Sequence, residues 1–278
     1  MFLYPLVLGI LSVLSPFLGL AIVMSYIGRT VGSSLISPLK SFMLFFVVPL
    51  GLLFWDKTTG SQMMALDAIF AVGVLALVYL YVLKRNHVFS EAFMVTNLVL
   101  VAYGLLRFQL FSAYQAESFE QGILLIQEQM PAWLDNVMFT ETLPLWKMIL
   151  PAIWIIGQSF ALLIGFLLFQ KTLKVPNFLA NMRFPGIYNL LIIAILPLYL
   201  LEQTKMFFFN ALIGLCVIPF LQGVSVMWQR LGLIFANRIV LSIFMVIIIL
   251  YASIILVLIG FGDMWLQKQK PNPGGTTA

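Results

Sequence analysis

Charged residues are scarce in this sequence. Only 9% of its 278 residues are Asp, Glu, Lys or Arg, whereas 62% are hydrophobic, and the mean hydropathy is +1.07. A soluble domain carries about a quarter charged residues, because water must solvate its surface. The sequence therefore excludes an ordinary soluble protein, and most of the exterior must face lipid.

Cysteine and histidine are almost absent. The single cysteine, Cys216, excludes a disulfide within the chain, and the single histidine, His87, excludes a paired-histidine metal site. The sequence also has no glycine-rich phosphate loop and no Gly-x-Ser-x-Gly nucleophile turn. These absences predict a protein that is not an enzyme and has no metal or cofactor. The basic residues stand singly rather than in a patch, which argues against a nucleic-acid partner.

Long apolar runs fill the chain instead. A hydrocarbon core about 30 Å thick needs roughly 20 helical residues, and lipid offers no partner for free backbone amides. The sequence thus predicts an all-α, polytopic membrane helix bundle of about eight spans. It would form one transmembrane domain, 1–265, with a flexible polar tail, 266–278. The predicted spans are roughly 3–27, 36–55, 63–83, 94–114, 145–170, 187–202, 207–229 and 239–262.

Two of these spans are weak, so seven spans with a re-entrant piece is the alternative. Lys40 interrupts the second span, and the sixth has only about sixteen apolar residues. The first stretch has no basic region or cleavage site of a signal peptide, so we expect it to stay in the mature protein. Pro16 lacks an amide donor and clashes with the preceding turn, which predicts a kink or break at Ser15–Pro16.

Basic residues fall in alternate loops, and the segment 116–143 is acidic and amphipathic. By the positive-inside rule this segment and both termini lie outside, although Lys268 and Lys270 then stand on the wrong side. The apolar residues of the segment recur at helical spacing, and Pro131 predicts a split into two short helices. The segment is either a lid over an outward-facing site or an interfacial helix hairpin.

A few polar residues lie inside or just at the ends of spans. Asp67 is about a turn into the third span, and Arg107 is about two turns from the outer end of the fourth. A charge in hydrocarbon is costly unless it is paired or reaches the interface, so an Asp67–Arg107 pair would relieve both. Alternatively, Asp67 reaches the interface and Arg107 only joins two helices. The predicted solute-site or polar-network residues are Asp67, Arg107, Gln158, Asn210, Gln222 and Asp263, and Gln158 is the predicted floor of a cavity.

Hydrogen bonds between helices, without any ligand, explain the buried amides equally well. Small residues at Gly157, Ala161 and Gly165 repeat every four positions, which lets another helix approach closely. We expect an internal helix contact there, with oligomerisation as the alternative.

The C-terminal half carries a family resemblance. Its features are VPNFLANMRFPGIYNLL, Asn210 in FFNALIGL, then LQGVSVMWQRLGL, and LIGFGDMW near the end. Over about residues 145–270 the chain resembles the YybS-like family of bacterial membrane proteins, a domain family of unknown function. Gly260, Asp263 and Trp265 match the family's final Gly-x-x-Asp-x-Trp pattern, but lysines replace the arginine that follows it.

This resemblance implies a multi-pass protein of the bacterial inner membrane. The family is distantly similar to the substrate-binding subunits of energy-coupling-factor importers, which bind a small solute and use ATP hydrolysis by partner proteins. Their first helix docks the coupling subunit through Ala-x-x-x-Ala. The nearest equivalents here are Ser15-x-x-x-Gly19 and Ala21-x-x-x-Ser25.

Three functions are therefore open. The first is a solute-binding membrane subunit of a transporter, whose partners are the lipid bilayer, a small molecule and a coupling protein. The second is a membrane scaffold or assembly factor, whose polar groups serve only helix packing. The third, an intramembrane enzyme, is disfavoured by the missing nucleophile–base pairs.

Overall fold

Helices make up the regular structure in the part of the chain that the computed structural model describes, residues 3–30, 42–86, 88–130, 137–172, 182–235 and 237–266. No strand occurs within these ranges, in agreement with the all-α prediction. The predicted tail from residue 267 onward, His87 and Pro131 lie outside them. The helices, with η1, η3 and η4 in the 3-10 form and η2 a π-helix, are α1 (Leu3–Leu14), α2 (Pro16–Thr30), η1 (Met43–Phe46), α4 (Val47–Trp55), α5 (Thr59–Leu66), η2 (Asp67–Val74), α6 (Leu75–Asn86), α7 (Phe89–Leu110), α8 (Ser112–Gln129), α10 (Val137–Thr172), α12 (Tyr188–Ala194), η3 (Leu196–Leu200), η4 (Glu202–Thr204), α13 (Lys205–Leu215), α14 (Val217–Ile234), α15 (Arg238–Tyr251) and α16 (Ser253–Leu266).

Several of these helices are long and apolar enough to cross a membrane. Four stretches of the described ranges qualify: Thr59–Arg85, Phe89–Leu110, Thr140–Phe169 and Glu202–Ile234. The pair α15–α16, which bends by 99° at Ala252, makes a fifth only if it is counted as one span. The predicted count of about eight is not confirmed, because the other apolar segments form helices of only 10–17 residues.

The chain divides into two compact units. Unit 1 comprises Met1–Pro176 and Leu198–Gly214, and unit 2 comprises Asn177–Pro197 and Leu215–Ala278. The single transmembrane domain over 1–265 stays a prediction.

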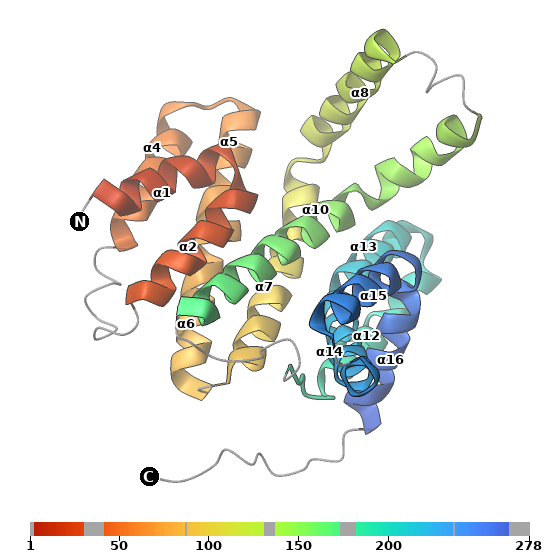
Figure 1. Ribbon diagram of the computed structural model, residues 1–278. Helices are drawn as coiled ribbons and strands as arrows, with labels where there is room; N and C mark the ends of the chain where they lie inside the picture. The colour runs from red at the N-terminus through yellow and green to blue at the C-terminus, as the bar shows by residue number, and fades with distance from the viewer. Residues whose placement is uncertain are drawn as a thin grey trace. The chain divides into compact units, whose positions relative to one another are not determined.

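In unit 1, α7 packs against α6 as the second arm of an antiparallel pair (Figure 1). The two arms, Thr59–Arg85 and Phe89–Leu110, are joined at Phe89 by a very short connection. Their other ends also meet, because a Cβ placed on Gly60 would lie 2.7 Å from the hydroxyl of Tyr114, just beyond α7. We call these the Phe89 end and the Tyr114 end of unit 1.

Helix α10 runs alongside this pair between Lys147 and Phe166. Near its start, Lys147 forms an ion pair with Glu120 of α8, at the Tyr114 end. Near its finish, Phe166 packs edge-on against Phe89, with ring centroids 6.2 Å apart. Unit 1 thus contains three long apolar helical stretches that lie alongside one another.

Helices α1 and α2 form a hairpin rather than one span. In a continuous helix with a rise of about 1.5 Å per residue, residues 4 and 26 would lie roughly 33 Å apart. The ring centroids of Tyr4 and Tyr26 are instead 4.9 Å apart, and Figure 1 shows the two helices folding back on each other. The predicted kink or break at Ser15–Pro16 is found as a break between α1 and α2. Because the chain reverses there, the predicted first span over 3–27 is not one continuous crossing.

The small-residue stripe of α10 is only partly a packing surface. A Cβ on Gly165 would lie 2.8 Å from Cβ of Met24 and 3.1 Å from Cα of Ala21, so α2 packs closely here. Ala161 is fully buried, whereas a Cβ on Gly157 would meet no atom within 4 Å. Close helix packing thus occurs at Gly165, whereas the space around Gly157 is open.

The predicted amphipathic segment 116–143 belongs to two helices. The helix α8 ends at Gln129, close to the predicted split. The predicted second short helix is not separate, because α10 runs without a break from Val137 to Thr172. Along α8 the side chains are largely uncovered, with Leu124 and Leu125 56% and 54% exposed.

Unit 2 is built on two helices that approach very closely. Substitute Cβ atoms on Gly223 of α14 and Gly260 of α16 would overlap the carbonyls of Leu256 and Pro219 on the opposite helix. A small apolar core, which includes Val224 and Leu256, lies between α14, α15 and α16. Only glycine at both positions permits this spacing.

Candidate functional site

The most unusual feature of unit 1 is a buried ion pair between η2 and α7. Asp67 is 3% exposed and Arg107 is 8% exposed. The guanidinium donates from Nε to Oδ1 at 2.7 Å and from Nη2 to Oδ2 at 2.9 Å. This two-pronged geometry is the strongest that arginine and a carboxylate form. The structure therefore brings together the two charged residues that the sequence singled out.

Aromatic side chains surround this pair. The hydroxyl of Tyr103 donates to Oδ1 of Asp67 at 2.8 Å, and the guanidinium carbon of Arg107 lies 4.6 Å from the ring centre of Trp154. Phe70 stacks on Tyr103 with centroids 5.4 Å apart. The carboxylate thus accepts three hydrogen bonds, and the guanidinium has a cation–π partner.

Asp67 lies at the junction between the capped helix α5 and the π-helix η2. Thr58 caps the start of α5 by accepting a hydrogen bond from the amide of Ser61. Hydrogen bonds from the Ser61 hydroxyl and the Thr58 amide lower the pKa of the Asp56 carboxyl. Asp67 then begins η2, and π-helical turns occur frequently at functional sites.

Sequence reasoning missed the aromatic partners of the pair. Tyr103 lies four residues before Arg107, so both point from the same face of one helix, and this spacing would have identified it. Trp154 gives no such signal, because it comes from α10, which is distant in the sequence.

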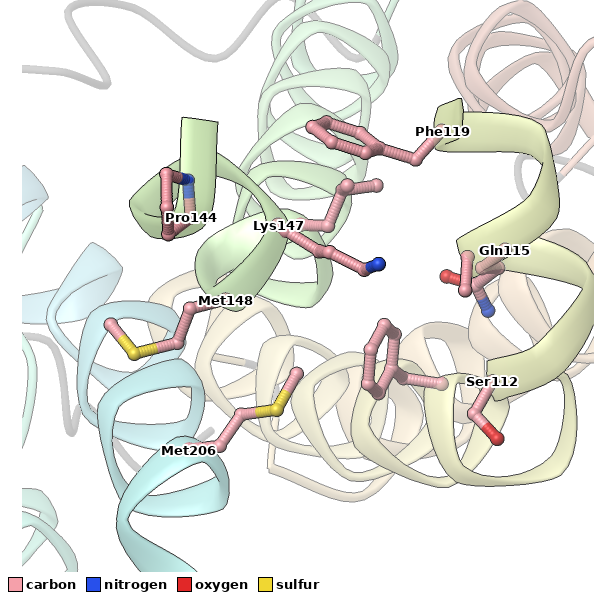
Figure 2. Close-up of a pocket in the computed structure, with 10 residues that line it drawn as sticks. Ser112, Gln115, Phe119, Pro144, Lys147, Met148 and Met206 are labelled. Carbon is pink, nitrogen blue, oxygen red and sulfur yellow. The ribbon is translucent and has the colours of Figure 1, made fainter. Parts of the chain in front are cut away.

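A pocket of about 470 Å³ lies beside the ion pair at the Tyr114 end of unit 1 (Figure 2). Phe108, the neighbour of Arg107, lines it, and Gln115 makes a long hydrogen bond of 3.5 Å to the carbonyl of Arg107. Helices α7, α8, α10 and α13 supply its lining residues, which are Phe108, Ser112, Gln115, Ala116, Phe119, Pro144, Lys147, Met148, Leu150 and Met206. None of the six predicted site residues belongs to this lining.

Asn210 has a structural role at a proline in α10. Pro151 cannot donate a hydrogen bond, and its ring displaces the carbonyl one turn before it. The side-chain amide of Asn210 fills the opened turn: its oxygen accepts from the amide of Ala152 at 2.8 Å, and its nitrogen donates to the carbonyl of Met148 at 2.9 Å. In a regular helix these two backbone groups would bond each other. Asn210 therefore stabilises the wall of the pocket without lining it.

Gln222 and Asp263 are brought together in unit 2. The Nε2 of Gln222 donates to Oδ2 of Asp263 at 2.6 Å, and its Oε1 accepts from the amide of Phe184 at 3.0 Å. Ser225, one turn further along α14, donates to the carbonyl of Met182 at 3.1 Å. These bonds hold the non-helical stretch before α12 against α14, which is a role in packing.

Gln158 is buried without a partner for one of its atoms. It is 3% exposed, and its Oε1 has no hydrogen-bond partner. It does not line the pocket, so the predicted cavity floor is not found there. The six predicted residues thus fall at four separate places rather than at one site.

Comparison with known proteins finds no match for this chain. No protein-family model, curated protein or solved structure matches it. The resemblance to the YybS-like family stays a prediction. Among the described residues, no three His, Cys, Asp or Glu side chains gather as a metal site would require.

Proposed function

We propose that this chain is a multi-pass protein of a bacterial inner membrane that binds a small solute, as the membrane subunit of a transporter powered by a partner protein. The observation that carries the proposal is the pocket between α8 and α10. Its volume of about 470 Å³ falls in the range of pockets that hold small ligands. It also lies at the end of three apolar stretches, where a solute would reach it from one side of the membrane.

The second supporting feature is α8 itself. Ser112, Gln115, Ala116 and Phe119 of α8 line the pocket, whereas the rest of this helix is mostly exposed. A helix that covers a pocket with one end and is otherwise uncovered is suited to open and close it. In this proposal α8 is the lid that the amphipathic segment 116–143 suggested.

The proposed membrane topology has seven crossings and one re-entrant hairpin, α1–α2. Within unit 1, α10 finishes at the Phe89 end, whereas Met206 lines the pocket at the Tyr114 end. In this proposal the intervening chain returns across the membrane, and we assign this crossing to α12 and η3. The same argument applies between α2 and α5. Met24 of α2 lies near Gly165 of α10, toward the Phe89 end, whereas α5 begins at the Tyr114 end. We therefore assign a further crossing to α4.

A membrane scaffold is the second candidate. It is favoured by the intrachain use of Asn210, Gln222 and Gly165, which all serve helix packing. The proposed docking positions on the first helices are also used within the chain, because Ala21 faces Gly165 and Gly19 packs on Ser12. In either case a partner protein would bind elsewhere.

Native mass spectrometry of the purified chain tests the proposal. We expect a small molecule to co-purify with the wild type and to be lost from Ala116→Trp, which fills the pocket. The matched control is Leu125→Trp on the exposed part of α8, which should keep the molecule. Equal thermal stability of both variants would show that they fold. If the wild type carries no small molecule, or both variants retain it, the scaffold is the better assignment.

A further inference from the structure

Among the described residues that line the pocket, one side chain is charged, and it is positive. Lys147 enters from α10, and the other lining residues are apolar apart from Ser112 and Gln115. Met148 and Met206 add flexible side chains that adapt to the shape of a bound group. A ligand that fits this lining has a large apolar body and one group that suits a cation.

We propose that the pocket binds an amphiphile with an apolar body and one anionic head group, a carboxylate or a phosphate. This inference rests on the proposed solute-binding function and names the chemical class of the solute. The head group would lie against Lys147, and the apolar body would lie among Phe108, Phe119 and Leu150.

Lys147 already forms an ion pair with Glu120, and the anionic head group of a ligand can take the place of Glu120 in it. Its Nζ lies 3.0 Å from Oε1 of Glu120, and the two side chains are 50% and 69% exposed. An ion pair this exposed contributes little to stability, so a ligand anion replaces Glu120 at small cost. Glu120 does not line the pocket, whereas Figure 2 shows Lys147 and Gln115 extending toward each other across it. Glu120 is therefore a competitor for Lys147 rather than part of the site.

Two substitutions should shift affinity in opposite directions. Lys147→Gln removes the cation, so it should weaken the binding of an anionic amphiphile by about tenfold, which corresponds to about 1.4 kcal/mol. Glu120→Gln removes the competitor, so it should strengthen the same binding severalfold. Neither change should affect a neutral amphiphile of the same chain length. Glu128→Gln, on the exposed end of α8, is the matched control for loss of a surface acid.

The experiment uses the full chain in nanodiscs of zwitterionic lipid. Binding of a fluorescent twelve-carbon carboxylate, phosphate monoester and alcohol is titrated for the wild type and each variant; the chain length is chosen as about right for a pocket of this size. Opposite effects of the two substitutions, on the anionic probes only, support the inference. Equal effects on the alcohol and the anions, or none on the anions, overturn it. The carboxylate and phosphate arms distinguish the two head groups.

The alcohol separates this inference from the proposal on which it rests. If the alcohol binds and Ala116→Trp abolishes that binding, the pocket binds solutes even where the charge effect is absent. If no probe binds in a way that Ala116→Trp affects, both the inference and the proposed function fail.

Discussion

Single residues in unit 1 show how a charge is accommodated among apolar helices. Asp67 and Arg107 are both buried, and each satisfies the other with two hydrogen bonds. Taking two charges out of water is expensive, and their attraction offsets this only when the geometry is good. Tyr103 and Trp154 complete that geometry. Removing one charge should therefore cost more than removing both.

A double-mutant cycle tests this expectation. Arg107→Ala strands the carboxylate of Asp67, so the free energy of unfolding should fall by about 3–5 kcal/mol. Asp67→Asn in the same chain removes the orphan charge and should recover part of the loss. The measurement is thermal stability in detergent, with the exposed Arg85→Ala as a control that should change little. A coupling energy below about 0.5 kcal/mol would contradict an energetically coupled Asp67–Arg107 pair.

The sequence could predict this pair but not its surroundings. Two opposite charges in neighbouring apolar segments are each costly unless they are paired, so their positions in the sequence predict the contact. The ring of Trp154 and the pocket beside it depend on how α10 packs, and no local pattern encodes that. The all-helical class followed in the same way from hydropathy, whereas the reversal at Ser15–Pro16 did not, because a proline signals a break without its angle.

At the scale of helices, α10 keeps its course through a proline because another helix supplies the missing bond. The Asn210 amide links the separated amide of Ala152 and carbonyl of Met148. Both groups belong to a stretch that is long and apolar enough to cross a membrane, where an unsatisfied backbone group would be costly. The sequence showed Pro151 and Asn210 separately, but their partnership requires the fold.

Asn210→Ala should therefore destabilise the chain by about 1–3 kcal/mol for each stranded backbone group. The loss should be smaller when Pro151→Ala is also present, because the helix can then form its own bond between Ala152 and Met148. Chemical or thermal unfolding of the four chains of this cycle provides the measurement. An equal loss from Asn210→Ala in both backgrounds would mean that the amide does not serve the proline.

Two glycines of α16 provide a matched pair of substitutions in unit 2. Gly260→Ala would drive a methyl group into the carbonyl of Pro219, so it should cost about 1–3 kcal/mol or more by overpacking. Gly262→Ala adds the same group two residues away, where no atom lies within 4 Å, and should be tolerated. Protease resistance of α14–α16 compares the two variants. Similar resistance in both would mean that the close approach of α14 and α16 does not hold unit 2 together.

At the scale of the whole molecule, the hairpin α1–α2 changes the expected topology. The sequence alone placed both termini outside, because it counted 3–27 as a crossing. A hairpin returns the chain to the side from which it entered, and Tyr4 lies against Tyr26. In the proposed topology Tyr4 therefore lies on the side of the Phe89 end, and the predicted location of α8 outside is unchanged.

Cysteine labelling in intact cells distinguishes these topologies. A cysteine that replaces Glu120 should react with an impermeant reagent from outside, and one that replaces Arg85 should not. A cysteine at Leu3 should behave like the one at Arg85. Replacing Cys216 with serine first removes the native thiol, since it is the only one in the chain. Outside labelling at Leu3 would contradict the hairpin, and outside labelling at Arg85 would reverse the whole orientation.

The π-helix η2 also sets the rotational phase of the helix that follows it. An α-helix turns by about 100° for each residue, and the wider π-helix turns by less. Over Asp67–Val74 this lag accumulates, so α6 presents a different side to its neighbours than an unbroken α-helix from Asp67 would. Tyr79 now meets Phe166, with ring centroids 5.9 Å apart. If η2 tightened into an α-helix while Asp67 stayed on Arg107, α6 would rotate about its own axis and carry Tyr79 away from Phe166. The length of the π-helix therefore determines whether the Asp67–Arg107 ion pair and the Tyr79–Phe166 contact can form at the same time.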